Sequence, residues 1–277
     1  WAGYSFMENG YPGSTLPDAH VFIHESGHMC SLEDYYSTDP NMTFGPAGKL
    51  EVMDIGILDH SVYSKMLLEW TFPYVIDGSE NTTTITLNPF ESSGDCIIIN
   101  DTWNGSPLDE YLAIEFYTPT GLNWRDSQPG GYPFAGLQGY TIPGIKIYHI
   151  DARGVRLAPD DSFDGYVTSS NDLSGGGRFA VGAANTPGPN SQTDSGGGPS
   201  GANYRLVHLM EATGTNSFRN GAPATNETLF TTGTSFTPSS TFFTKGTQFN
   251  NGSEVGYTIY IDTVTATSAT IRVVKNV

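Results

Sequence analysis

The chain has few basic residues and few cysteines. It carries 12 Lys and Arg residues against 29 Asp and Glu residues, a formal net charge of −17. Nucleic acids and anionic membrane surfaces attract basic proteins, so neither is an expected partner. The 2 cysteines are too few for a disulfide framework. No apolar run approaches the roughly 18 residues of a membrane-spanning helix, so no span is expected.

Small and polar residues dominate what is present. The chain has 277 residues, of which 33 are Gly and only 15% are charged. Abundant Gly, Thr, Ser and Asn with enough apolar residues for a large core indicate a loop-rich β protein, and we expect it to be secreted and extracellular. The acidic excess could also bind calcium. The candidate carboxylates are Asp39, Asp101, Asp109, Asp126, Asp151, Asp160, Asp161 and Asp164.

One short segment points to metal chemistry. Residues 24–28 read His-Glu-Ser-Gly-His, and Asp34 follows. Residues four apart share one face of a helix, so His24 and His28 can hold one metal ion. Glu25 can accept a proton from a metal-bound water, which is the arrangement of a zinc peptidase. After a turn, Asp34 can supply a third ligand and leave one position open for water.

The neighbouring residues favour this interpretation over a surface helix with two chance histidines. Asp18 is a candidate N-cap, and an apolar run over 19–23 follows it. We therefore expect a largely buried helix over 18–31, with His20 as a neighbour of the site and not a ligand. Cys30 points about 200° away from His28 around the helix, so a buried packing cysteine is the expectation for it and for Cys96.

These residues resemble a known family. Residues 24–36 are similar to the zinc helix of the immune inhibitor A-type metallopeptidases, a metzincin-like group of secreted bacterial enzymes with the pattern H-E-x-x-H-x-x-G-x-x-D. Residues 52–56, Val-Met-Asp-Ile-Gly, resemble the Met-turn beneath the zinc. Residues 59–70 resemble the helix after this turn, and residues 144–151 and 209–212 resemble later strands. The resemblance implies zinc as cofactor, the ligands His24, His28 and Asp34, the catalytic base Glu25, and support from Met53.

The chain departs from the family at two positions. Ser31 stands where the family has glycine, at a turn that needs positive φ, which costs a non-glycine residue on the order of 1 kcal/mol. We interpret the turn as strained but workable. Ile55 lies two residues after Met53, where some metzincins have a tyrosine, so no tyrosine role is carried over.

The expected fold class is α+β. Residues 1–75 would form the C-terminal part of a metallopeptidase domain, packed on a mostly antiparallel, sandwich-like β module over 76–277. Residues 1–17 read as a loop and cannot supply the sheet that normally precedes the zinc helix, so an N-terminal segment of the same protein is an expected partner. A loop is predicted over 37–51.

A second helix is predicted after the Met-turn, capped by Asp59 and stopped by Pro73. Its residues Val62, Met66 and Trp70 follow helical spacing and should pack beneath the metal site. His60 at its start, and Asp54, are candidate second-shell residues around the metal ligands.

Seven later segments are rich in β-branched and aromatic residues and are predicted as strands. They are Thr82–Leu87, Cys96–Asn100, Tyr111–Tyr117, Gly144–Asp151, Tyr204–Glu211, Gly256–Asp262 and Ala269–Lys275. His149 and His208 lie within them and are expected to be satisfied core residues. Long loops are predicted over 121–143 and 152–203.

The motif favours a secreted zinc endopeptidase acting on a protein or peptide substrate. Two alternatives remain open. One is an extracellular binding or adhesion protein with a vestigial site, suggested by the aromatic loop 121–143. The other is a structural β protein in which zinc staples the helix, which a fourth protein ligand would favour.

Overall fold

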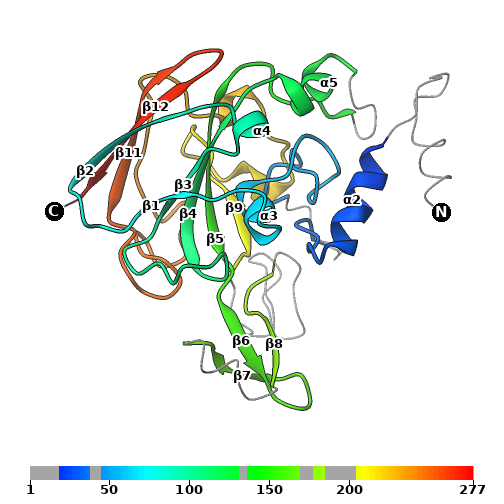
Figure 1. Cartoon of the computed structure of the whole chain (residues 1–277), viewed down its shortest axis with the longest axis vertical. Coiled ribbons are helices and arrows are strands. Elements are labelled where there is room, and N and C mark those ends of the chain that lie inside the picture. The colour runs from blue at the N-terminus through cyan, green and yellow to red at the C-terminus, as the bar shows by residue number, and fades with distance from the viewer. Residues whose placement is uncertain (1–18, 38–44, 131–135, 169–176, 185–203, 277) are drawn as a thin grey trace.

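The computed structural model of the chain describes residues 19–37, 45–130, 136–168, 177–184 and 204–276 (Figure 1). These residues form an α+β fold with mostly antiparallel sheets and few helices. The α-helices are α2 (His20–Met29), α3 (Val62–Leu67), α4 (Phe90–Ser93) and α5 (Trp124–Ser127). Single turns of 3-10 helix, η1 (Gly121–Asn123), η4 (Ser217–Asn220) and η5 (Asn226–Thr228), lie between the strands. None of the described helices is long and apolar enough to cross a membrane.

A five-stranded sheet forms the middle layer of the molecule. Its strand order is β1-β3-β4-β5-β9, and only the pair β1–β3 is parallel. The strands are β1 (Tyr74–Ile76), β3 (Cys96–Ile99), β4 (Glu110–Tyr117), β5 (Gly144–Asp151) and β9 (Val207–Leu209). Both faces of this sheet are covered, because every residue of β3, β4, β5 and β9 is buried.

A four-stranded antiparallel sheet covers one face of the middle layer. Its order is β10-β11-β12-β2, with strands β2 (Thr82–Leu87), β10 (Ser235–Phe236), β11 (Tyr257–Val264) and β12 (Ala269–Lys275). A third sheet, β7-β6-β8, projects away from these layers in Figure 1. It consists of β6 (Gly154–Leu157), β7 (Phe163–Tyr166) and β8 (Arg178–Val181).

The two larger sheets pack as a β-sandwich. Successive side chains of a strand point to opposite faces, and Ile97, Ile114 and Ile147 of the middle sheet fall in one apolar cluster with Ile259 and Ile271 of the four-stranded sheet. We call this side of the five-stranded sheet the sandwich face. It is dominated by isoleucine and phenylalanine.

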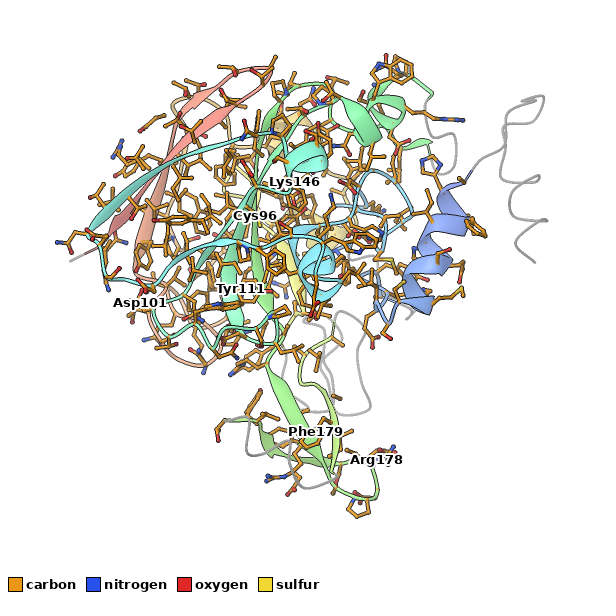
Figure 2. All side chains as sticks on the ribbon, in the orientation of Figure 1. Cys96, Asp101, Tyr111, Lys146, Arg178 and Phe179 are labelled. Carbon is orange, nitrogen blue, oxygen red and sulfur yellow. The ribbon has the colours of Figure 1, made fainter. Side chains whose placement is uncertain are left out.

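The opposite side of the five-stranded sheet, the helix face, packs against α3 and the loop over residues 45–61. Ile98, Tyr111 and Tyr148 of the sheet share a second apolar cluster with Met53 and Val62. Figure 1 shows the resulting order of layers, with the four-stranded sheet, the five-stranded sheet and then α3 and α2. Tyr111 is labelled in Figure 2 together with Lys146, a buried cation on the same face.

The helix face also contains a buried ion pair. Lys146 Nζ lies 2.9 Å from Glu115 Oε1, and the other oxygen of Glu115 accepts a hydrogen bond from the backbone N–H of Val62 at the start of α3. A paired and hydrogen-bonded charge is tolerated in a core, whereas an isolated one is not. The sheet therefore positions α3 through a carboxylate as well as through apolar packing.

The strand predictions agree closely with the structure in three cases. β2, β5 and β12 have the predicted bounds, and β3 and β4 differ by one residue at one end. β11 begins one residue later and ends two residues later than predicted. β9 covers only three residues of the predicted Tyr204–Glu211. The strands β1 and β10 were not predicted, and β6, β7 and β8 lie within the predicted loop 152–203.

The two predicted helices need correction. The zinc-motif helix is not largely buried, since among its residues only His24 and Gly27 are buried and Met29 is 84% exposed. Asp18, its predicted N-cap, lies outside the described residues. The N-cap of α3 is Ser61 and not Asp59, which instead pairs with Lys65. The helix α3 ends at Leu67, well before Pro73, because Glu69 takes a positive φ of 55°.

Trp70 is a further correction. It is 60% exposed and does not pack beneath the site, because it follows the end of α3. Val62 and Met66 are buried as expected. The domain boundary after residue 75 stays a prediction, although one apolar cluster contains residues from both of its sides.

Candidate metal centre

The helix α2 presents His24 and His28 on adjoining turns. Their rings approach edge to face, with centroids 4.9 Å apart. His24 is buried and His28 is half-buried, so the pair lies at the edge of the protein and not in its core. The i,i+4 spacing accounts for this arrangement directly.

The turn after α2 returns the chain toward the two rings. The N–H of Leu32 donates to the carbonyl of Gly27, and the N–H of Ser31 donates to that of His28. This pair of bonds is a Schellman motif, in which the residue after the C-cap is left-handed. Ser31 has φ 69°, which confirms the predicted positive φ at this position.

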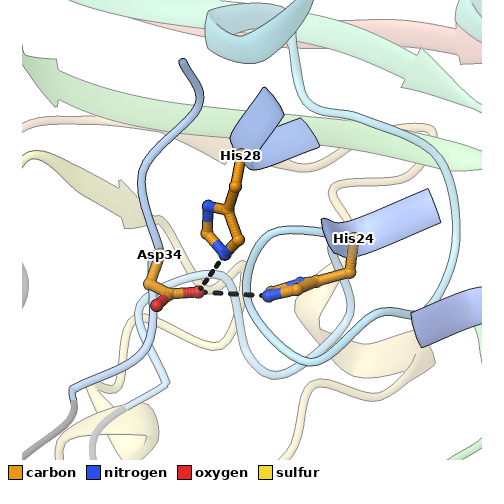
Figure 3. A group of neighbouring side chains, drawn as sticks. All are labelled: His24, His28 and Asp34. Atoms are coloured by element: carbon orange, nitrogen blue, oxygen red, sulfur yellow. Dashed lines mark ion pairs between the residues drawn. The ribbon is translucent and has the colours of Figure 1, made fainter. Parts of the chain in front are cut away.

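The turn brings Asp34 to both histidines (Figure 3). Oδ1 of Asp34 lies 3.1 Å from Nε2 of His24 and 3.2 Å from Nε2 of His28. Within the described part of the chain, these three residues form the one group of three or more His, Cys, Asp or Glu side chains that could hold a metal ion, with ligand atoms within 4.8 Å of one another. Two imidazoles and one carboxylate are a typical ligand set for catalytic zinc.

Backbone carbonyls orient both rings. Nδ1 of His24 lies 2.7 Å from the carbonyl oxygen of Val52, and Nδ1 of His28 lies 2.8 Å from that of Leu32. A carbonyl can only accept, so each Nδ1 carries the proton and each neutral ring has its lone pair on Nε2. Both lone pairs therefore face the region beside Asp34, as a metal ligand requires.

The Asp34 carboxylate gives an independent test of whether a cation fits. Its Oδ1 is buried and accepts no hydrogen bond of proper geometry from the described residues, although two Nε2 atoms lie near it. With the protons on Nδ1, three lone-pair atoms converge without a hydrogen between them. A divalent cation would remove this repulsion, so the residues present fit a metal.

The acid–base state of the cluster agrees with such a site. Burial raises the pKa of Asp34, but contact with His24 and the charges of both histidines outweigh it and hold the pKa below its ordinary value. Burial lowers the pKa of His24, yet Asp34 and the Val52 carbonyl raise it by more, so its net pKa is above the ordinary value. Asp34 is therefore anionic at neutral pH, and a metal would compete with a proton for His24.

The segment around Met53 contacts both ligand-bearing parts of the chain. Its carbonyl accepts a hydrogen bond of 2.9 Å from the N–H of Tyr35, next to Asp34. Its sulfur packs against Gly27 so closely that a Cβ at residue 27 would lie 2.5 Å from it. The glycine inside the histidine motif thus makes room for the methionine, and Met53 contacts both the helix and the segment that carry the candidate ligands.

Two buried carboxylates, Glu51 and Asp54, accept hydrogen bonds from the backbone of the loop over residues 45–61. Glu51 was not among the predicted site residues. Glu51 accepts hydrogen bonds from the N–H groups of Met53 and Ser61. Asp54, a predicted second-shell residue, accepts from the N–H groups of Ala47 and Lys49 and touches no ligand directly. Burial is the main cause that raises the pKa of each carboxyl to about 7. No local motif distinguishes Glu51 from a surface acid, because its partners are two backbone N–H groups and the hydroxyl of Ser64, which come from later parts of the chain.

Tyr36 is a second residue whose place the sequence did not indicate. Its ring stacks on His24 with centroids 6.2 Å apart and planes inclined by 22°. Burial and the nearby Asp34 charge raise the pKa of its phenol to about 12, so it stays protonated. Its position two residues after Asp34, the third candidate ligand, was the only available signal.

Glu25 lies beside the cluster and is half-buried. Its carboxylate is close enough that its charge raises the pKa of His24 and of Tyr36. It is not one of the three converging ligands. A carboxylate near a metal site but outside its ligand set has the position of a general base.

The other candidate residues lie around the centre without joining it. Nε2 of His20 donates a hydrogen bond of 2.8 Å to Oδ1 of Asp126. The ring of His60 packs edge-on against Trp70, and its buried Nδ1 has no hydrogen-bond partner among the described residues. Cys30 is exposed, which corrects its predicted burial, whereas Cys96 is buried as expected.

The candidate calcium carboxylates are engaged by the protein itself. Asp39 lies outside the described residues, and no three of the others converge on one point. Each of the others accepts a hydrogen bond or forms an ion pair: Asp101, Asp109, Asp126, Asp151, Asp160, Asp161 and Asp164.

Comparisons with protein-family models, with curated proteins and with solved structures gave no match. The interpretation of this centre therefore depends on its own geometry and on the motif that forms it.

Proposed function

We propose that the protein is a secreted zinc-dependent endopeptidase of the immune inhibitor A-like, metzincin-like type. The observation that carries the proposal is the convergence of His24, His28 and Asp34, with both Nδ1 protons directed to carbonyls and both Nε2 lone pairs directed to one region. Glu25 beside this ligand set, and Met53 beneath it, support a catalytic role.

The proposed residue roles follow from this arrangement. His24, His28 and Asp34 would hold zinc, which when bound lowers the pKa of a ligated water and polarises the scissile carbonyl. Glu25 accepts the proton of the attacking water and delivers it to the leaving amine, so that it acts first as base and then as acid. Tyr36 remains a protonated phenol beside the ligands and can donate a hydrogen bond there.

The direct test replaces Glu25 by alanine in the zinc-loaded chain. The variant should bind about one zinc per chain, as measured by elemental analysis, because the ligand set is intact. Cleavage of an unstructured protein substrate should fall by a factor on the order of 10² to 10⁴, the usual contribution of a general acid–base group. Retained cleavage in this variant would refute the mechanism.

A matched ligand variant distinguishes the alternatives. His28→Ala should lose both zinc and cleavage. A wild-type chain that binds zinc tightly through four protein ligands and cleaves nothing would instead be the structural β protein, with zinc as a staple. A chain that binds no zinc and cleaves nothing would leave the adhesion alternative.

A further inference from the structure

A pocket lies on the side of α2 that faces away from Glu25. It has a volume of about 430 Å³, and its lining includes Ile23, Val52, Leu58, His60 and Trp70. We call it the His60 pocket. Ile23 and Glu25 are about 200° apart around the helix, so the pocket and the proposed catalytic base lie on different sides of α2.

The walls of the His60 pocket are mainly apolar, and several of these side chains are also exposed. Ile23 is 45% exposed, Trp70 60% and Leu122 68%, and all three line the pocket. Large apolar side chains that gather at a concave surface indicate a binding site. A cavity of about 150 Å³ is enough to hold benzene, so the His60 pocket has room for a substituted aromatic ring.

Hydrogen bonds fix the part of the lining formed by residues 58–60. The backbone N–H of Leu58 donates to Oδ2 of Asp126 at 2.8 Å, and that of Asp59 donates to Oδ1 of Asn123 at 3.2 Å. The two acceptors belong to α5 and η1, so these bonds connect two separate segments around the pocket. A pocket preorganised in this way loses little conformational freedom when a ligand binds.

The two carboxylates of the lining are engaged within the protein. Asp126 accepts from Nε2 of His20 through Oδ1 and from the N–H of Leu58 through Oδ2. Asp59 accepts from the backbone N–H of His60 and forms an ion pair with Lys65. Each of the four carboxylate oxygens therefore has a partner already, and a cationic ligand would have to compete with it.

His60 supplies the polar group that a ligand can reach. The residue is only 9% exposed, neither nitrogen of its ring makes a hydrogen bond with a described residue, and Nδ1 is shielded from solvent. Burial is the main cause that lowers the pKa of His60, so the ring is neutral at neutral pH and offers an anion no charge. A buried polar group without a partner costs free energy, which a hydrogen-bonding ligand would recover.

We propose that the His60 pocket binds a small neutral phenol. The ring of the phenol packs against Ile23, Leu58 and Trp70, and its hydroxyl forms a hydrogen bond with the His60 imidazole. A hydroxyl can donate or accept, so it matches either tautomer of the ring. Trp70 already packs edge-on against His60 with centroids 5.8 Å apart, a geometry that aromatic rings favour. The proposal depends on neither zinc binding nor peptide cleavage.

The test measures the binding of p-cresol and toluene to the full chain by calorimetry, with a chelator present so that the phenol cannot bind at the metal centre. The two compounds differ only in the hydroxyl. Both should bind saturably, and p-cresol about threefold to tenfold more tightly, the value of one hydrogen bond between neutral groups. His60→Phe keeps an aromatic ring without nitrogens, so it should lower the affinity for p-cresol to that for toluene.

A second pair of variants tests the apolar wall, and the exposure of Trp70 means that it can be truncated even if His60→Phe does not fold. Trp70→Ala should weaken the binding of both compounds about threefold to tenfold. Phe163→Ala removes a 41% exposed aromatic side chain on the projecting sheet and should leave both affinities unchanged.

Four results would overturn the proposal. They are the absence of saturable p-cresol binding, equal affinities of the wild-type chain for p-cresol and toluene, equal effects of Trp70→Ala and Phe163→Ala, and binding of 4-methylcyclohexanol as tight as that of p-cresol. The last compound keeps the hydroxyl but has no aromatic ring.

Discussion

The two faces of the five-stranded sheet are built in different ways. The sandwich face is mainly apolar, with Ile97, Ile114 and Ile147 packed against the four-stranded sheet. The helix face mixes apolar side chains with buried carboxylates, notably Glu51, Asp54 and Glu115, whose oxygens accept hydrogen bonds from backbone N–H groups. Regular strands can satisfy their own backbone, whereas the irregular loop 45–61 needs side chains to do so.

The sandwich face mainly stabilises the fold, whereas the helix face carries the contacts that position the candidate metal ligands. Apolar burial is non-directional and tolerates small shifts, so it suits a face whose role is to hold the fold. A metal ligand must be placed within fractions of an ångström, and the carbonyls of Val52, Leu32 and Met53 make directional hydrogen bonds to the candidate ligands or to a residue next to them. The sandwich face also becomes polar where its apolar layer ends, at a pocket whose lining includes His149, His208 and Asn250.

The largest effect on stability is expected from a cavity in the sandwich. Ile147→Ala removes a fully buried side chain and should lower the free energy of unfolding by about 2–5 kcal/mol, measured by chemical denaturation. The zinc affinity of the folded variant should be unchanged, because the metal centre lies beyond the other face. Ile142→Ala, at a position 37% exposed, is the control and should cost less than about 0.5 kcal/mol. A loss of zinc affinity in the folded Ile147→Ala variant would show that packing on the sandwich face also determines the geometry of the metal centre.

A pH-dependent effect is expected from Asp54 on the helix face. Its folded-state pKa of about 7 is above the ordinary 3.8, so between these values the folded state keeps a proton that the unfolded state releases. Stability of the metal-free chain should therefore fall as pH rises through this window and stay low above it. Asp54→Asn keeps an oxygen to accept from Ala47 and Lys49, and should stabilise the metal-free chain at pH 7.5 by on the order of 1–3 kcal/mol.

Denaturation in the presence of a chelator from pH 4 to pH 8 measures this effect. The slope should decrease in Asp54→Asn without vanishing, because Glu51 is also shifted to about 7. Asp164→Asn, at an exposed position on the projecting sheet, is the matched control. An unchanged slope in Asp54→Asn would show that this carboxyl is ionised in the folded state.

The smallest effect is expected at the turn between the ligands. Ser31→Gly relieves a positive φ of 69° and should raise the free energy of unfolding by a few tenths to about 1 kcal/mol, since the greater freedom of glycine in the unfolded chain offsets part of the gain. Ser31→Ala keeps the unfavourable φ and should give no gain. Equal stability of the glycine and alanine variants would indicate that the strain is relieved by other contacts.

The elements that depend on local sequence were predictable. The bounds of β2, β5 and β12 follow from β-branched and aromatic runs, and the helical spacing of His24 and His28 from the motif itself. The projecting strands β6, β7 and β8 were not, because each is only four residues long and lies in a glycine-rich part of the chain. Their pairing partners, and not their composition, define them as strands.

The burial of individual residues was less predictable than their secondary structure. Trp70 has helical spacing with Met66 but is exposed, because the left-handed Glu69 ends the helix first. The apolar run before His24 suggested a buried helix, yet Phe22 and Ile23 are 41% and 45% exposed. A periodic pattern indicates which side chains share a face, but only the packing of other elements decides whether that face is covered.

The sequence by itself determined the metal-ligand candidates and the positive φ at Ser31, because both depend on contacts within eleven residues, from His24 to Asp34. Only the tertiary structure decided that Val52 and Met53 orient these ligands, and that Arg205, His208 and Arg219 line one pocket with His149. Local spacing sets the direction of a side chain along a helix or strand. Which distant groups meet it is set by strand pairing and by the burial of apolar surface over the whole chain.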